Sequence, residues 1–259
     1  MAKAIAITNQ KGGVGKTTTA VNLTAALHAQ GKTVLLCDFD PQANASSGLG
    51  YRKRRQGGIY PVLLGQAPAE EAIVSTLYGD LLPSSPELSG AGVELVSMDR
   101  REYRLLDALA PVRDRYDYIF IDCPPSLNIL TLNAFCASDG VIIPMQCEYF
   151  ALEGISVILR MIDKLREAGA APALAVEGIV MTMYDVRTNL SRQVTDEIKT
   201  HFPQALYSTL IPRSVRLAEA PSHGQSVLAY APDSTGAAAY RKLAREFLKR
   251  RAAKDPAHA

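Results

Sequence analysis

The segment that decides the fold reads Gln10-Lys11-Gly12-Gly13-Val14-Gly15-Lys16-Thr17-Thr18. It follows an apolar run of strand length, residues 4–8, and precedes a helical pattern, residues 16–30, that ends at Gly31. A glycine-rich loop between a strand and a helix is typical of phosphate binding, because glycines let successive backbone N–H groups turn onto phosphate oxygens at the positive end of the helix. We therefore expect this segment to bind a nucleoside triphosphate.

The residue types of the loop predict individual roles. Lys16 is expected to reach the β and γ phosphates, and the Thr17 hydroxyl to ligate Mg²⁺. The usual pattern GxxxxGK[ST] has a glycine where this chain has Gln10, and this chain has further glycines at positions 12 and 13. Gly12 would let the backbones of two chains approach each other closely, and Lys11 would be a second cation that stabilises the γ-phosphate. The expected nucleotide-binding residues of the loop are Lys11, Gly12, Gly13, Val14, Gly15, Lys16, Thr17 and Thr18.

Apolar runs of strand length alternate with helical patterns along the whole chain. The runs span residues 4–8, 33–37, 93–97, 118–121, 140–143, 177–183 and 206–211, and several lack polar alternation, as strands covered on both faces do. The helical patterns span residues 16–30, 102–114, 128–137, 152–168, 189–201 and 235–251. This order predicts a single α/β domain, residues 1–251, with a mostly parallel twisted sheet flanked by helices on both faces. Residues 51–92 are the least regular, and we expect residues 252–259 to be a disordered tail.

Two of the buried runs end in aspartates. Asp38 and Asp40 follow the run 33–37, and Asp122 follows the run 118–121. Because the ligand crevice of an open parallel sheet lies at the carboxyl ends of its strands, we expect these carboxylates to converge on the phosphate loop. Thr17, Asp40 and Asp122 are therefore the candidate residues around Mg²⁺.

Composition sets limits but selects no function. The 259 residues are 47% hydrophobic and 21% charged, and no stretch approaches the roughly 18 apolar residues of a membrane span. The first residues lack the pattern of a secretory signal, so we expect a cytoplasmic protein. A net charge of +2 neither supports nor excludes DNA binding. Without CxxC spacing, the four cysteines are expected to be reduced core residues: Cys37, Cys123, Cys136 and Cys147.

Residues 11–17 resemble the deviant Walker A motif of the ParA/MinD family of ATPases, in which the first lysine contacts the nucleotide of the partner subunit. The likeness continues through segments 38–50, 147–154, 181–188 and 211–224, which look like the small chromosomal ParA proteins known as Soj. It covers nearly all of residues 3–250 and is weakest at about residues 51–92. There the run Arg52-Lys53-Arg54-Arg55 is not a pattern typical of the family.

The resemblance implies how the catalytic residues divide the work. Lys11 is the lysine that acts on the partner's nucleotide, so the catalytic set is Lys11, Lys16 and Asp40. Asp122 resembles the Walker B aspartate, which holds Mg²⁺ through water, and Asp40 resembles the residue that orients the attacking water. Asp38 looks like a group that supports them. An aspartate is a weak base, but orienting water matters more than deprotonating it in a loose transition state, so slow turnover is expected.

The resemblance also implies sites outside the phosphate loop. The adenine base is held near the strand end Thr182-Met183 and near Pro212 and Arg213. Arg187 and Arg216 resemble the two arginines that bind DNA without sequence preference in the Soj group. Such binding needs phosphate contacts and no base readout, so a few arginines on one face suffice, and dimerisation doubles their number.

The function implied by the resemblance is a slow, Mg²⁺-dependent ATP hydrolase that partitions a chromosome or a plasmid. ATP would join two chains into a homodimer, the dimer would bind double-stranded DNA without sequence specificity, and a ParB-type partner would stimulate hydrolysis and release. We expect such a protein to be nucleoid-associated and not to bind a membrane.

Three other functions stay open. A MinD-like membrane-positioning ATPase should end in a separate amphipathic helix, whereas the apolar stripe Tyr240, Leu243, Ala244, Phe247 and Leu248 also suits a last helix packed on the core. An iron–sulfur electron-transfer protein would need paired thiolates, at a spacing that Cys123 and Cys136 do not have. A switch that binds ATP without hydrolysing it would not need Asp40. The basic runs 52–55 and 249–251 either extend a DNA-binding patch or are solvated.

Overall fold

A seven-stranded sheet forms the centre of the protein. The structure, a computed structural model, describes residues 1–51, 58–149 and 151–254. The sheet has the order β3-β4-β2-β5-β1-β6-β7, and all neighbouring strands are parallel except β3 and β4, which pair antiparallel at one edge. The expected mostly parallel α/β fold is confirmed. The strands are β1 (Lys3–Ile7), β2 (Val34–Asp38), β3 (Val74–Thr76), β4 (Gly79–Leu82), β5 (Tyr118–Asp122), β6 (Gly140–Gln146) and β7 (Ala175–Thr182).

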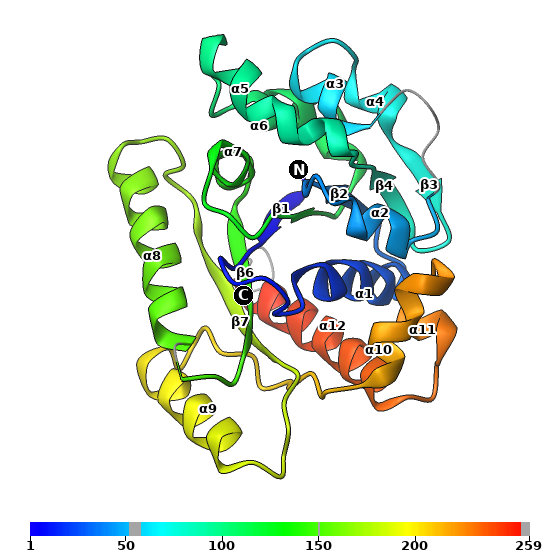
Figure 1. Cartoon of the computed structure of the whole chain (residues 1–259), viewed down its shortest axis with the longest axis vertical. Helices are drawn as coiled ribbons and strands as arrows, with labels where there is room; N and C mark the ends of the chain where they lie inside the picture. The colour runs from blue at the N-terminus through cyan, green and yellow to red at the C-terminus, as the bar shows by residue number, and fades with distance from the viewer. Residues whose placement is uncertain (52–57, 150, 255–259) are drawn as a thin grey trace.

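Side chains alternate between two hydrophobic cores, one on each face of the sheet. In β1, Ile5 and Ile7 join one core while Ala4 and Ala6 join the other. Figure 1 shows α1 beside α12 on the first face and α8 on the opposite face. The first core is covered by α1 (Lys16–His28), α2 (Asn44–Gly48), α10 (Val215–Glu219), α11 (Val227–Tyr230) and α12 (Thr235–Lys254). The second is covered by α3 (Ile59–Leu63), α4 (Ala69–Ala72), α5 (Ala91–Glu94), α6 (Arg104–Leu109), α7 (Ile129–Cys136), α8 (Ala151–Glu167) and α9 (Asn189–His201).

One expected strand, residues 93–97, is wrong. The segment is helical, as α5 followed by the 3₁₀ turn Leu95–Ser97. Across this segment and the 3₁₀ helix Pro86–Gly90 before it, the buried side chains Leu88, Ala91 and Leu95 are spaced three and four apart, while Val93 and Val96 are exposed. This is the spacing of one helix face, not the alternation of a strand. The strands that complete the edge are instead β3 and β4, within the region that the sequence pattern left unassigned.

A second expected strand, residues 206–211, forms no continuous ladder. The N–H groups of Tyr207 and Ile211 donate to carbonyls of β7, each at 2.9 Å. Between them, the N–H groups of Ser208 and Thr209 donate to the Glu246 carboxylate of α12 at 2.8 and 2.9 Å. The segment is therefore extended along β7, but its middle is bound to a helix and not to the sheet.

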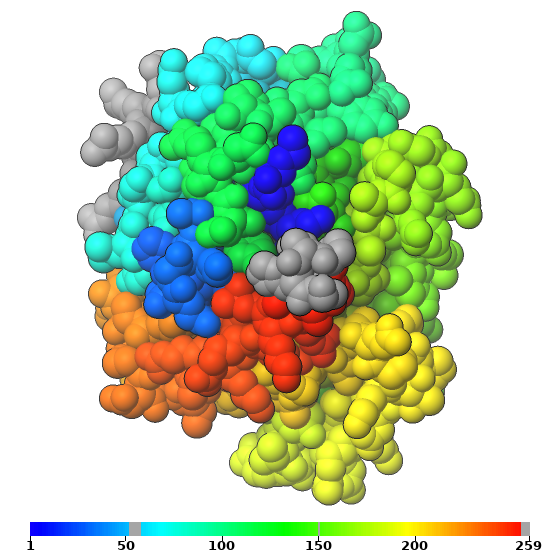
Figure 2. All heavy atoms as spheres, turned by 180° about the vertical axis from the view of Figure 1, so that it is seen from behind, coloured from blue at the N-terminus to red at the C-terminus, as the bar shows by residue number. Residues whose placement is uncertain are grey.

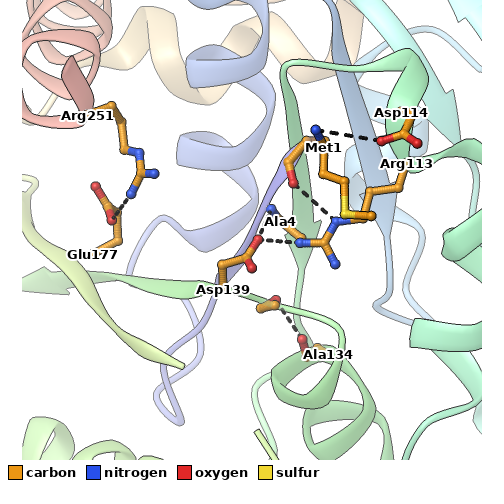
Figure 3. Close-up of polar contacts among 10 residues, drawn as sticks. Met1, Ala4, Arg113, Asp114, Ala134, Asp139, Glu177 and Arg251 are labelled. Carbon is orange, nitrogen blue, oxygen red and sulfur yellow. Dashed lines mark hydrogen bonds and ion pairs between the residues drawn. The ribbon is translucent and has the colours of Figure 1, made fainter. Parts of the chain in front are cut away.

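Polar contacts fix the amino-terminal edge of the sheet, opposite the carboxyl ends of the parallel strands (Figure 3). The Asp139 carboxylate accepts a hydrogen bond from the Ala4 N–H at 2.8 Å and pairs with Arg113. Arg113 also donates to the Ala2 carbonyl at 3.1 Å. Farther along this edge, Arg251 of α12 pairs with Glu177 of β7 at 3.1 Å. These contacts hold the starts of β1 and β7 in place.

The last helix packs on the core along its whole apolar stripe. Four residues of this stripe are fully buried: Tyr240, Leu243, Ala244 and Phe247. The stripe therefore belongs to the core, which is the alternative to a membrane-binding helix. Helix α12 continues through Lys254, three residues past the expected domain boundary, and residues 255–259 lie outside the described part of the chain. Seen from behind, the start of the chain (blue) lies at the centre of the face, above α12 (red) (Figure 2). Within the described residues, no helix combines the length and apolar character needed to cross a bilayer.

Candidate nucleotide-binding site

Glycines shape the loop between β1 and α1. Gly13 and Gly15 have φ angles of +74° and +87°, a backbone conformation that residues with side chains rarely adopt. No atom lies within 4 Å of the position that a Cβ would take at Gly12 or Gly13, so the loop is an open cradle. Helix α1 begins immediately after Gly15, whose carbonyl accepts from the Thr19 N–H at 2.9 Å. The positive end of α1 therefore adjoins this cradle.

Lys16 spans the cradle. Its ammonium group donates to the backbone carbonyl of Lys11 at 2.9 Å, and the residue is only 7% exposed. Burial lowers the pKa of Lys16, while the nearby carboxylates of Asp122 and Asp40 oppose this shift. The expected convergence of the lysine with two strand-end aspartates is thus present in the structure.

Asp122, at the end of β5, is fully buried, and among the described residues its carboxylate oxygens have no partner at full hydrogen-bond geometry, although the Thr17 hydroxyl lies close by. Burial, followed by repulsion from Asp38, raises its pKa well above the usual value, against the opposing effects of the Thr17 hydroxyl and Lys16. An unpaired buried carboxylate beside a threonine hydroxyl suits a divalent cation. Mg²⁺ binds through one or two protein oxygens together with water and phosphate. No cluster of three or more His, Cys, Asp or Glu residues among the described ones forms an all-protein metal site.

Asp38 and Asp40 hold different positions. Asp38 is fully buried, and its Oδ2 accepts from the N–H and hydroxyl of Ser46 at 2.7 and 2.6 Å, which fixes the first turn of α2. Burial raises the pKa of Asp38 to about 6, although the Ser46 bonds lower it. Asp40 is 7% exposed, and its Oδ1 accepts from the Gln42 N–H at 2.9 Å. The Asp40 N–H donates to Asp38 Oδ1 at 3.3 Å, so Asp38 supports the turn that carries Asp40. The Asp40 carboxylate is close enough to Lys16 to influence its pKa.

Lys11 lies on the exposed rim of the loop. Its ammonium group pairs with Glu148, in the segment after β6, and 56% of its side chain is exposed. Its backbone N–H donates to the Asn9 side chain at 3.0 Å. The side chain therefore projects outward, away from the buried Lys16, although its carbonyl faces inward.

A cavity of about 200 Å³ adjoins the phosphate loop. Five of the expected nucleotide-binding residues line it: Gly15, Thr18, Met183, Pro212 and Arg213. Met183 has φ +49°, unusual for a residue with a side chain, and directly follows β7. Ile211, Leu217 and Tyr240 supply an apolar lining suited to a purine ring.

The two candidate DNA-binding arginines are exposed, and each is paired within its own chain. Arg187 donates to both carboxylate oxygens of Asp185 at 2.9 and 2.6 Å, and 84% of its side chain is exposed. Arg216 pairs with Glu219 at 2.8 Å. Arg187 comes four residues after Met183, and Arg216 three residues after Arg213. Both arginines thus extend from segments that line the 200 Å³ cavity.

The other basic runs differ from this pair. The run 52–55 lies outside the described residues. In the run 249–251, Arg250 donates to the Leu206 carbonyl at 2.5 Å and Arg251 pairs with Glu177 of β7, so two of its three cations hold α12 to the protein. All four cysteines are free; Cys37, Cys123 and Cys136 are buried and Cys147 is partly buried. The expectation of reduced core cysteines is confirmed for the first three.

Gln146 and Tyr240 at the site were not anticipated from the sequence, and Thr182 was expected only near the adenine base. Gln146 and Thr182, at the ends of β6 and β7, donate hydrogen bonds to the phosphate loop. Tyr240 of α12 lines the cavity and lies 3.2 Å from the Thr19 hydroxyl of α1. Hydropathy identifies Tyr240 only as part of an apolar stripe, and no local pattern links any of the three to a loop more than 130 residues away.

Comparison with known proteins finds similar sequences over nearly the whole chain. Residues 2–176 match the family model described as an AAA domain. The chain is 49% identical over 255 residues to the chromosome partitioning protein ParA of Myxococcus xanthus, covering 97% of this chain and 90% of the relative. It is 51% identical over 249 residues to the sporulation initiation inhibitor protein Soj of Bacillus subtilis, covering 95% and 98%.

A solved structure shares the fold with a bound nucleotide. It is cobyrinic acid a,c-diamide synthase from Mycobacterium smegmatis with an ATP analogue and magnesium, at a TM-score of 0.86 and 36% identity, covering 98% of both chains. The fold is therefore shared with a protein named for a different reaction, so the fold alone does not assign a function. The sequence relatives, at about half identity over nearly the whole length, are the more specific guide.

Proposed function

The chain belongs to the ParA/Soj family of chromosome-partitioning ATPases, and from this premise we propose that it is an ATP-driven DNA-partitioning switch. In this proposal the ATP-bound chain dimerises, the dimer binds double-stranded DNA, and hydrolysis releases both contacts. The observation that carries the proposal is the phosphate cradle, with Lys16 and Asp40 beside the unpaired buried carboxylate of Asp122.

ATP binding uses the two halves of the site. The triphosphate lies in the cradle of residues 11–18, where Lys16 exchanges its bond to the Lys11 carbonyl for bonds to phosphate oxygens. The adenine base enters the cavity lined by Met183, Pro212 and Arg213. Thr17 and Asp122 are the residues that would hold Mg²⁺. When bound, Mg²⁺ neutralises charge on the β and γ phosphates.

Hydrolysis needs a positioned water more than a strong base. The Asp40 carboxylate accepts from the Gln42 N–H, and the Asp40 N–H donates to Asp38, so the carboxylate is held in one orientation, within electrostatic reach of Lys16. It orients the attacking water in line with the γ-phosphate. The expected turnover is slow, and a ParB-type partner stimulates it.

The dimer depends on Lys11. This side chain is exposed on the rim of the loop, and within the described residues it is held by an ion pair with Glu148, a surface partner that another anion can readily replace. In the dimer it contacts the triphosphate of the partner, and the open space over Gly12 and Gly13 admits the second chain. ATP then joins two chains, and ADP, which lacks the γ-phosphate, does so less well.

DNA binding uses Arg187 and Arg216 on each chain. Both are exposed, and both extend from segments that line the cavity proposed for the base. Four such arginines in a dimer give a phosphate-binding surface without base readout, so affinity should fall steeply with salt.

Size-exclusion chromatography of Asp40→Ala with and without ATP, followed by duplex DNA binding across a salt series, tests the proposal. We expect an ATP-dependent shift to a dimer and DNA binding only by that dimer. A monomer under both conditions, or equal DNA binding with and without ATP, would contradict the switch.

A further inference from the structure

Two neighbouring side chains at the strand ends opposite the phosphate loop hold the loop in place. Gln146 and Thr182 are the last residues of β6 and β7, and the register of these parallel strands pairs them directly. The Gln146 amide donates to the Gly13 carbonyl at 2.9 Å, and the Thr182 hydroxyl donates to the Val14 carbonyl at 2.7 Å. Two consecutive carbonyls of the loop are therefore bound to the end of the sheet.

These two bonds determine where the loop's N–H groups point. In a planar trans peptide, the carbonyl and the following N–H point in opposite directions. Because the Gly13 carbonyl points toward Gln146, the Val14 N–H points away from Gln146. Because the Val14 carbonyl points toward Thr182, the Gly15 N–H points away from Thr182. An anion is held by successive backbone N–H groups that point into one concavity. The strand ends thus select the orientation that a phosphate-binding loop requires.

The loop needs this external support because its own residues restrict it little. Gly13 and Gly15 flank the two peptides, and the glycine backbone has many accessible conformations that binding would have to restrict. Thr182 is 2% exposed, so its bond to Val14 is shielded from water. A Cβ at Gly15 would lie 3.6 Å from the Thr182 side chain, so Thr182 also lies beside the second glycine of the loop.

We propose that Gln146 and Thr182 are positioning residues for nucleotide binding. They orient the peptides 13–14 and 14–15 of the phosphate loop before ATP binds. This inference rests on the proposed ATP binding. Neither residue is placed against the reacting atoms, so both act through the loop. A competing explanation is that the two residues act on the adenine base. Thr182 lines the cavity proposed for the base, and the Gln146 amide lies 2.9 Å from the Met183 sulfur.

Two ligands separate a role in phosphate binding from a role in base binding. Dissociation constants for Mg-ATP and for inorganic tripolyphosphate, which has no base, are measured for Thr182→Val and Gln146→Leu. Each substitution removes the donor and roughly keeps the size of the side chain. We expect each variant to weaken both ligands about fivefold, and the double variant about 25-fold, as for the loss of one and two neutral hydrogen bonds. Thr182→Ser, which keeps the hydroxyl, should bind both ligands like the wild type.

Matched controls make the same chemical changes elsewhere. Thr195→Val and Gln30→Leu each remove a side-chain donor to a backbone carbonyl, at 2.8 and 3.0 Å, within helix α9 and at the end of α1. They should bind both ligands normally. If thermal denaturation shows that Thr182→Val is not folded, Gln146→Leu still tests the proposal, because the contact of Gln146 with the loop is the more exposed of the two.

The outcomes are distinct. If ATP weakens but tripolyphosphate does not, the two residues act on the base and the proposal is wrong; it is equally wrong if neither ligand changes. If the wild-type protein binds neither ligand, the proposed ATP-binding function fails, and the positioning role fails with it.

Discussion

The ammonium group of Lys16 lies 2.9 Å from the backbone carbonyl of Lys11, so the two lysines of the phosphate loop meet through the main chain of one and the side chain of the other. Lys16 points into the cradle, while the Lys11 side chain points outward to Glu148. The geometry therefore separates their functions, because truncating the Lys11 side chain leaves the partner atom of Lys16 in place.

The first prediction concerns these lysines. Lys16→Ala should weaken ATP binding at least about 100-fold, since it removes a charge-assisted contact to phosphate. Lys11→Ala should keep ATP binding by the single chain and lose the ATP-dependent dimer. Isothermal titration calorimetry and light scattering on both variants measure the two effects. Loss of ATP binding by the Lys11→Ala monomer would show that its side chain acts within its own subunit.

The second prediction concerns Asp40. Asp40→Asn keeps an oxygen that can accept from the Gln42 N–H, so the local turn should persist, but the charge that orients the water is lost. We expect the rate of phosphate release to fall about 100-fold or more, while the ATP dimer accumulates on DNA. Hydrolysis at the wild-type rate would mean that the assigned role is wrong.

The third prediction concerns the unpaired carboxylate of Asp122. Because its pKa is raised in the folded state, the folded chain keeps a proton that the unfolded chain has released. Stability from this group is therefore complete below the unfolded pKa of about 4 and is lost as the pH rises through the folded pKa. Asp122→Asn stays neutral, so the free energy of unfolding without nucleotide should exceed that of the wild type by about 1–3 kcal/mol at high pH.

Urea unfolding of Asp122→Asn and the wild type between about pH 6 and pH 8 measures this difference. Asp38, whose pKa is about 6, is half titrated at the lower limit of this range, so the upper part of the range reports on Asp122. Asp163→Asn, on the exposed side of α8, is the control and should follow the wild type. Parallel pH curves for Asp122→Asn and the wild type would contradict the raised pKa. The same variant should lose Mg²⁺-dependent hydrolysis.

The fourth prediction concerns Arg216 and its partner Glu219. Arg216→Glu should lower DNA affinity at low salt by at least about tenfold, and reduce the salt dependence, while the ATP dimer still forms. Glu219→Gln removes the carboxylate that competes with DNA phosphate for Arg216, so DNA affinity should rise up to about fivefold. Fluorescence anisotropy with duplex DNA across a salt series measures both.

Arg160→Glu on α8 makes the same charge reversal at an exposed arginine outside the proposed surface, and should bind DNA like the wild type. If Arg216→Glu loses the dimer as well as DNA, Arg216 has a structural role. If Glu219→Gln weakens DNA binding, the carboxylate positions the arginine and does not compete for it.

Much of the architecture followed from local patterns. The loop 10–18, the alternation of strands and helices and the aspartates at two strand ends were sufficient to predict a parallel sheet with a phosphate site at its carboxyl edge. The strand predicted at residues 93–97 was wrong because a short apolar run fits a buried strand and a buried helix turn equally well. The edge strands β3 and β4 are only three and four residues long, too short for a period of two to stand out.

The sequence by itself determined the chemistry of the site, because glycines, a lysine, a threonine and strand-end aspartates carry the same bonding capacity wherever the chain places them. Only the tertiary structure decided which way each group points: Lys11 outward and Lys16 inward, Asp38 onto Ser46, and Gln146 and Thr182 onto two loop carbonyls. Those directions are set by contacts between residues up to about 170 positions apart, through strand register and burial, and no local pattern of residues encodes them.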